Sequence, residues 1–100
     1  GFSLENLVYL ELLRRGYKVM IGRIGNTKVD FVAEKQGAYT YYQVTADMTA
    51  QETFEREMRP LAQIRDNYEK IILTADRLTV GNYNGIRVKN LTDWLLGKEN

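Results

Sequence analysis

The sequence contains no cysteine and no histidine, and only one proline and one tryptophan, among its 100 residues. Without cysteine, the chain forms no disulfide and offers no thiolate to a metal ion. Without histidine, no imidazole is present to act as an acid, a base or a metal ligand. Any metal ion must therefore be bound by oxygen atoms, which favours magnesium, manganese or calcium over zinc.

Long apolar runs and a strong net charge are also missing. No run approaches the roughly 20 residues that cross a bilayer, and no basic segment followed by an apolar core opens the chain, so we expect a cytoplasmic protein without a membrane partner. Fourteen basic and 13 acidic side chains give a net charge of +1, and a net charge this small does not indicate that the protein binds nucleic acid. A content of 44% hydrophobic and 27% charged residues indicates one globular domain over residues 1–100.

Apolar periodicity and turn residues predict a helix, three strands, a helix, two strands and a last helix. Pro60 is expected to kink the second helix or to divide it in two, and residues 75–85 are expected to form a loop. This order describes a mixed sheet with packed helices, an α/β sandwich. The predicted ranges are 3–15, 17–24, 28–35, 38–45, 49–66, 70–74 and 86–89, and Asn90 is the predicted cap of the last helix.

Residues 28–45 form a predicted hairpin with a tight turn at Gln36-Gly37, and polar side chains lie where core is expected. Asp30 falls inside the first strand, and Gln43 and Thr45 share one face of the second. If the strands are in register, these three side chains lie close enough to share a water or a metal ion. The alternative is structural: Asp30 bonds to a backbone amide or to Gln43, whose buried amide is thereby satisfied.

A resemblance enters with the order of these residues along the chain. A helix bearing Glu5, a strand bearing Asp30 and a strand bearing Gln43-Val44-Thr45 resemble the PD-(D/E)XK nuclease fold. The segments Glu5-Asn6-Leu7-Val8-Tyr9-Leu10-Glu11-Leu12 and Val29-Asp30-Phe31-Val32-Ala33-Glu34 are similar to the uncharacterised C-terminal domain of many predicted archaeal and bacterial AAA-type ATPases. The likeness covers nearly the whole chain.

The resemblance implies a restriction-endonuclease-like three-layer sandwich with an α-β-β-β-α-β core and a C-terminal helix. It also implies that the chain is part of the C-terminal region of a larger ATPase, whose motor lies upstream and is its first partner. In intact members, two carboxylates hold a divalent cation and a lysine of Glu-x-Lys positions the nucleophile. Here Gln43 replaces the acidic residue and Thr45 replaces the lysine.

We therefore expect a vestigial site of Glu5, Asp30, Gln43 and Thr45, with Lys28 as a possible substitute cation. No cofactor is expected for an inactive domain. Magnesium on Asp30 and Glu5 is expected if the domain is an active DNase, and a third alternative is a structural domain that forms oligomers.

Nucleic-acid binding has its own candidate residues, each with an alternative role. A set of basic residues could contact phosphates, although a solvated helix end and strand edge is the commoner role of such residues. Three tyrosines could stack on bases, although packing within the sheet is the commoner role. The basic residues are Arg14, Arg15, Lys18, Arg23 and Lys28, and the tyrosines are Tyr39, Tyr41 and Tyr42.

Overall fold

The computed structural model describes residues 3–98, which form three helices and six strands. None of the helices in this range is long and apolar enough to cross a bilayer. In chain order the elements are α1 (Leu4–Arg14), β1 (Lys18–Ile24), β2 (Thr27–Lys35), β3 (Ala38–Thr45), α2 (Gln51–Ala62), β4 (Glu69–Thr74), β5 (Gly81–Tyr83), β6 (Ile86–Asn90) and α3 (Leu91–Leu95).

The six strands form one mixed sheet in the order β1-β2-β3-β4-β6-β5. The first three strands are an antiparallel meander, whereas β3 pairs with β4 and β4 with β6 in parallel. The parallel step from β3 to β4 passes through α2, as a crossover connection requires. The predicted mixed sheet and its parallel step are thus confirmed.

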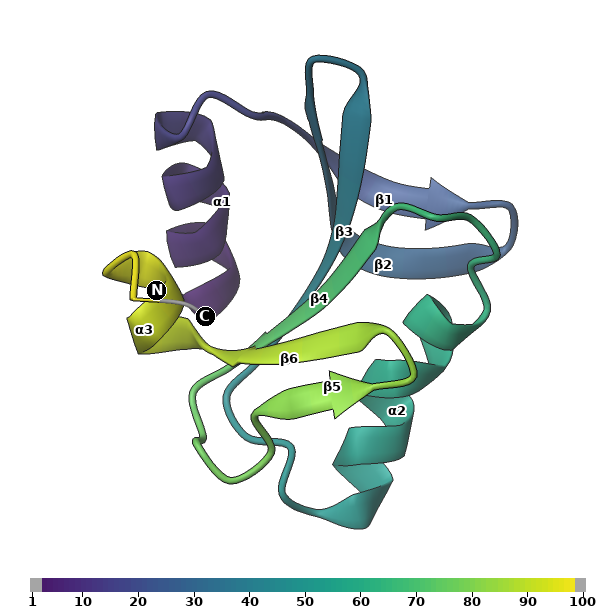
Figure 1. Cartoon of the computed structure of the whole chain (residues 1–100), viewed down its shortest axis with the longest axis vertical. Coiled ribbons are helices and arrows are strands. Elements are labelled where there is room, and N and C mark those ends of the chain that lie inside the picture. Colours follow the sequence, from purple (N-terminus) through teal and green to yellow (C-terminus); the bar gives the residue numbers. More distant parts are fainter. Residues whose placement is uncertain (1–2, 99–100) are drawn as a thin grey trace.

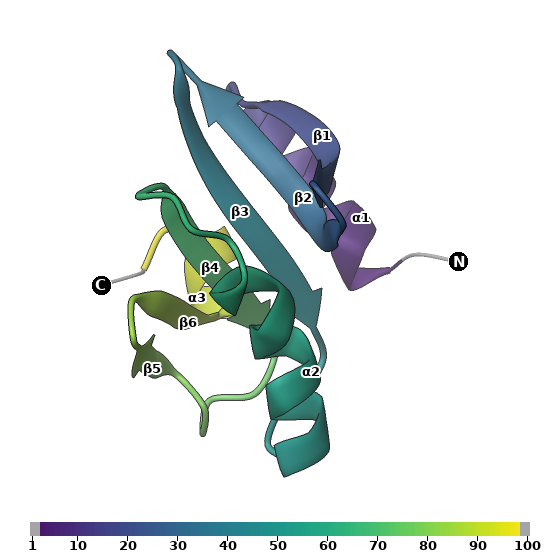
Figure 2. The same ribbon diagram turned by 90° about the vertical axis from the view of Figure 1, so that its right-hand side faces the viewer.

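Helices cover both faces of this sheet (Figure 1). α1 and α3 lie on one face and α2 lies on the other, and the view turned by 90° places α2 in front of the sheet with α1 and α3 behind it (Figure 2). The fold is therefore a sandwich of three layers, in which each face of the sheet buries its own apolar cluster.

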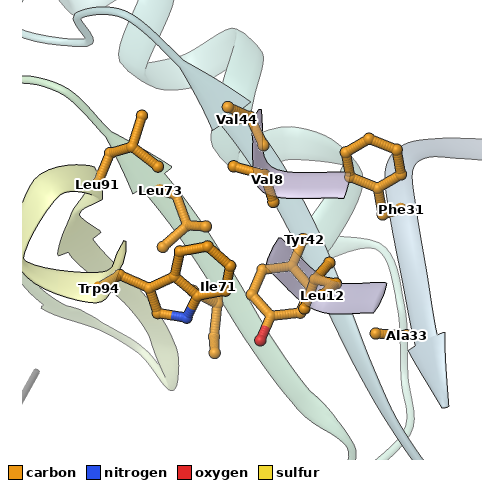
Figure 3. Packing of buried hydrophobic residues seen from close by; sticks show 10 residues of the cluster. All are labelled: Val8, Leu12, Phe31, Ala33, Tyr42, Val44, Ile71, Leu73, Leu91 and Trp94. Atoms are coloured by element: carbon orange, nitrogen blue, oxygen red, sulfur yellow. The ribbon is translucent and has the colours of Figure 1, made fainter. Parts of the chain in front are cut away.

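The core on the α1 and α3 face is built around Trp94, which is 1% exposed. Its ring lies 5.9 Å from that of Tyr42 (Figure 3). The guanidinium of Arg15 lies 4.2 Å from the centre of the same Trp94 ring. Burial of an aromatic side chain stabilises the fold by a few kcal/mol, since the value for the smaller Phe is on the order of 1.5–3 kcal/mol. The cluster comprises Val8, Leu12, Phe31, Ala33, Tyr42, Val44, Ile71, Leu73, Leu91 and Trp94.

The core on the opposite face gathers under α2. Leu61 of the helix and Met48, which precedes it, are both fully buried there. Central strand β4 is buried on both faces, as predicted, because Ile71 and Leu73 face one cluster and Ile72 the other. The α2-face cluster comprises Val29, Val32, Tyr41, Met48, Leu61, Ile64, Ile72, Ile86 and Val88.

The ends of α1 and α3 follow their sequence signals. The Ser3 hydroxyl accepts a hydrogen bond of 3.1 Å from the amide of Asn6, and Asn90 accepts one of 3.0 Å from the amide of Asp93. Both are N-caps that satisfy an otherwise unpaired amide of the first turn. Gly16 follows α1 with a φ of +91°, a left-handed conformation that glycine adopts without strain.

Two expectations about the second half of the chain need correction. α2 is one helix that continues through Pro60 to Ala62, so the alternative of two short helices is wrong, and the helix ends before the predicted residue 66. Residues 75–85 do not form a plain loop, because residues 81–83 form β5 and pair with β6. Asn84 and Gly85 connect the two strands with positive φ values of 54° and 92°, as a tight hairpin turn requires.

A β-bulge distorts the pairing of β1 with β2. Met20 faces Val32 and Gly22 faces Val29, so two residues of β2, Asp30 and Phe31, face one residue of β1. Bulges of this kind bend a strand and redirect its side chains. Gly22 allows the strands to approach here, since a Cβ built on it would lie 2.2 Å from a Val29 methyl carbon.

We predict that Gly22→Ala lowers the free energy of unfolding by about 1–3 kcal/mol, the usual cost of overpacking. Gly81→Ala is the matched control, because its Cβ would meet only ordinary contacts at 3.7 Å in another edge strand. Urea denaturation of both variants measures the difference. Equal losses in the two variants would show that β1 and β2 are not closely packed at the bulge.

Candidate functional site

The candidate site lies where the pairing of β2 with β3 changes character. The regular pairing runs from Lys35 with Ala38 to Phe31 with Tyr42 and stops there, although both strands continue. Beyond this point the side chains of Asp30 and Gln43 join the strands. The Gln43 Oε1 accepts a bond of 2.9 Å from the amide of Asp30, and the Asp30 Oδ2 accepts one of 2.8 Å from the amide of Val44.

The carboxamide of Gln43 also reaches α2. Its Nε2 donates to the backbone carbonyl and to the Oε1 of Glu57, both at 3.4 Å. Gln43 is 6% exposed, so its polar atoms need protein partners, and these bonds supply them. The two strands and the α2 helix are therefore joined through one buried amide.

Carboxylates from three elements influence one another at this site. Burial raises the pKa of Asp30, and the charge of Glu5 raises it further, while the amide of Val44 and the charge of Lys28 oppose the change. Burial also raises the pKa of Glu57. The charges of Asp30 and Glu5 raise this pKa further, whereas the charge of Arg56 lowers it. Glu5 belongs to α1 and Glu57 to α2, so negative charge converges on Asp30 from helices on both faces of the sheet.

The donor set differs from the pair of strand carboxylates in the nuclease pattern. Asp30 and Glu57 already accept bonds from Val44 and Gln43, and Gln43 contributes a neutral amide where a second strand carboxylate would stand. Across residues 3–98, no three acidic side chains lie close enough together to hold a metal ion. Magnesium usually keeps several waters and binds one or two carboxylates, so the exchange of a carboxylate for the neutral Gln43 amide removes a large part of the charge that would attract the ion.

Thr45 and Lys28, the other residues predicted for the site, make different contacts. The Thr45 hydroxyl donates to the carbonyl of Asp47 at 3.4 Å, and among the described residues it bonds to neither Asp30 nor Gln43. Lys28 is exposed at the start of β2 and acts on Asp30 through its charge. The structure thus joins Asp30 and Gln43 directly, with Glu5 and Lys28 near them and Thr45 at the rim.

Two of the predicted phosphate-binding residues belong to an ion pair within the fold. The Arg14 Nη2 and the Arg15 Nε each lie 2.7 Å from the Glu11 Oε2. Hydrogen bonds from Arg14 and then Arg15 lower the pKa of Glu11 to about 2. Arg15 also donates to the carbonyl of Trp94 and covers its ring, so its place in α1 is explained by packing.

The other basic candidates line the β1 and β2 strands. Lys18 begins β1 opposite Glu34, whereas Arg23 and Lys28 face each other near the opposite end of the strand pair. All three basic side chains are exposed. Like charges placed directly opposite in a sheet repel, so the Arg23 and Lys28 pair is the cationic feature here that packing does not explain.

Two of the three tyrosines proposed to stack on bases are buried, and the third is partly exposed. Tyr41 and Tyr42 are buried, and the Tyr41 hydroxyl donates to Asp66 at 2.6 Å. Tyr39 is half-exposed and lies 5.1 Å from the ring of Tyr68. Stacking between side chains therefore accounts for Tyr42 and Tyr41, and only Tyr39 keeps an accessible ring.

Glu57 was not among the residues predicted for the site. Its signal was present, because Phe54, Glu57, Met58 and Leu61 recur at helical spacing and place the carboxylate on the inner stripe of α2. A charged residue within an apolar stripe is the sequence signal that marks Glu57 as a candidate site residue.

Comparison with known proteins gives one informative likeness. No family model matches the chain. The chain is 40% identical over 93 residues to an uncharacterised protein of Haemophilus influenzae, in a match that covers 93% of this chain and 22% of the relative. The chain thus spans about a fifth of the length of the curated relative that it matches.

We predict that Glu57→Gln raises the free energy of unfolding at pH 7 by up to about 1 kcal/mol, within the range of single substitutions. The fold raises the pKa of Glu57, so ionisation costs stability once the pH exceeds the ordinary value of 4.5. The substitution removes this cost and keeps an acceptor for Gln43.

The gain should shrink as the pH falls from 7 to 4, because the folded wild type then binds the proton itself. Urea denaturation at several pH values measures it. Glu55→Gln, on the exposed side of the same helix, is the matched control and should show no such gain. A gain at Glu57 that did not change with pH would contradict the electrostatic cause.

Proposed function

We propose that this chain is a restriction-endonuclease-like domain that has lost metal-dependent cleavage and serves as an accessory module of an AAA-type ATPase. Its role in that setting is to bind nucleic acid or a protein partner, and the ATPase motor lies elsewhere in the parent protein. The observation that carries the proposal is the use of Asp30 and Gln43 as a structural bridge between β2 and β3.

The bridge argues against cleavage because Asp30 and Gln43 already form hydrogen bonds within the protein, at the positions where a nuclease would bind a metal ion. The Asp30 Oδ2 is bonded to a backbone amide, and both ends of the Gln43 amide are bonded to protein. A carboxamide also lacks the charge that a second carboxylate brings to a divalent cation. In the nuclease pattern the residue two places after Gln43 is a lysine, and Thr45 provides no ammonium there.

The three-layer architecture and the relative support the same proposal. The meander, the crossover helix α2 and the parallel strand β4 occur in the order that the resemblance implies. The match to one region of a much longer protein is consistent with a module of a larger chain. Attachment to an ATPase remains part of the proposal and derives from the resemblance alone.

An active magnesium-dependent DNase is the second candidate, and one observation favours it. Glu57 adds a carboxylate that the sequence pattern did not supply, and the charges of Glu5, Asp30 and Glu57 act on one another. Perturbed pKa values of this kind gather at functional sites, although structural networks also produce them.

A plasmid assay separates the two candidates. Supercoiled plasmid is incubated with the wild type and with Asp30→Ala while magnesium and then manganese are titrated, and nicked and linear products are measured. We predict no cleavage above the level of Asp30→Ala. A mobility shift of the same plasmid that weakens steeply with salt would identify nucleic acid as the bound partner.

The double substitution Gln43→Glu with Thr45→Lys is the informative companion variant. It restores the carboxylate and ammonium of the nuclease pattern, and circular dichroism checks that it folds. New cleavage by this variant would support descent from a nuclease. Cleavage by the wild type that disappears in Asp30→Ala would refute the inactive proposal and establish the DNase.

A further inference from the structure

Strand β1 offers an unpaired edge of the sheet. Among the described residues it pairs only with β2, since it stands first in the strand order. Its seven residues, Lys18–Ile24, therefore present backbone donors and acceptors on their outer side (Figure 1). Proteins usually protect such edges with charges, proline or a covering segment, because another strand can pair there.

The side chains of β1 are unusually apolar for an exposed edge. Ile21 is 79% exposed, and Met20 and Ile24 are each 38% exposed. Ile21 stands alone at the β-bulge against two residues of β2, and it belongs to neither buried cluster. An exposed apolar edge strand favours association with an extended segment.

A hollow of about 360 Å³ lies beside this edge on the α2 face. Gly22 contributes no side chain to it, and Val29, its partner in β2, belongs to the α2-face cluster. The hollow would accept an apolar side chain of a strand added to β1. Its walls are Met20, Ile21, Gly22, Arg23, Ile24, Val32, Tyr39, Tyr41 and Tyr68.

The positive charge of β1 indicates which kind of segment would pair with it. β1 carries Lys18 and Arg23 and no acidic residue, and exposed Lys28 faces Arg23 from β2. Arg23 borders the hollow and Lys28 lies directly opposite it on β2, so positive charge flanks the position that an added strand would take. A second copy of β1 would bring the same positive charge, whereas an acidic segment would be attracted.

From these features we infer that β1 binds an extended segment of a partner protein, in which apolar and acidic residues alternate, as an added seventh strand. Backbone hydrogen bonds to β1 provide affinity, an apolar side chain fills the hollow, and acidic side chains meet Arg23 and Lys28. This inference is independent of the nuclease-like site and holds whether or not that site is active.

A synthetic peptide tests the inference directly. The probe is acetyl-Glu-Val-Glu-Phe-Glu-Val-Glu-amide, titrated into the nitrogen-15-labelled 100-residue chain. We expect amide shift changes concentrated in β1, and we expect the same peptide with lysine in place of glutamate to bind about tenfold more weakly or worse. Sedimentation of the chain alone measures self-association.

Two substitutions of the protein complete the test. Ile21→Glu should weaken peptide binding by about tenfold or more, as loss of a central contact does. Leu78→Glu is the matched control, because Leu78 is 87% exposed in a loop far along the chain, and it should bind like the wild type. Arg23→Glu provides a second readout if Ile21→Glu lowers the melting temperature.

Several results would overturn the inference. They are an absence of peptide binding at millimolar concentration, shift changes outside β1, and equal binding of the lysine peptide. Peptide affinity unchanged in both Ile21→Glu and Arg23→Glu would do the same. Self-association of the chain that Ile21→Glu abolishes would assign the edge to a second copy instead.

Discussion

The structure depends on two side chains that continue a sheet where its backbone pairing ends. Asp30 and Gln43 each accept a hydrogen bond from a backbone amide across the gap between β2 and β3, at 2.8 and 2.9 Å respectively. Buried amides left without partners cost about 1–3 kcal/mol each, so the two polar side chains are required at this point for the fold itself. The same exchange fixes the position of α2, because the Gln43 amide also bonds Glu57.

This constraint gathers polar and charged side chains where the pairing of β2 with β3 ends. The bulge between β1 and β2 falls at Asp30, the regular pairing of β2 with β3 ends at Phe31 and Tyr42, and the charges of Glu5 and Glu57, from helices on opposite faces of the sheet, act at this point. Here a neutral amide occupies the gap and exchanges bonds with its neighbours, and the remaining carboxylates repel one another.

Local signals predicted much of the fold because they act over a few residues. Ser3 and Asn90 cap their helices, and Gln36 and Gly37 form the tight turn with φ values of 53° and 83°. Strand β5 was missed although Asn84-Gly85 carries the same kind of turn signal. Periodicity did not predict the bulge, because the bulge depends on the register between β1 and β2. Periodicity does place Glu57 on the inner stripe of α2, but the contact of Glu57 with Gln43 follows only from the packing of α2 on the sheet.

The most direct test of the central claim is amide hydrogen exchange at Val44 in the wild type and in Asp30→Ala. The account predicts that the Val44 amide exchanges about as slowly as the paired amide of Ala33 in the wild type. In Asp30→Ala it should exchange much faster, while Ala33 is little changed. Fast exchange at Val44 in the wild type, or protection that survives the loss of the carboxylate, would contradict the bridge between the strands.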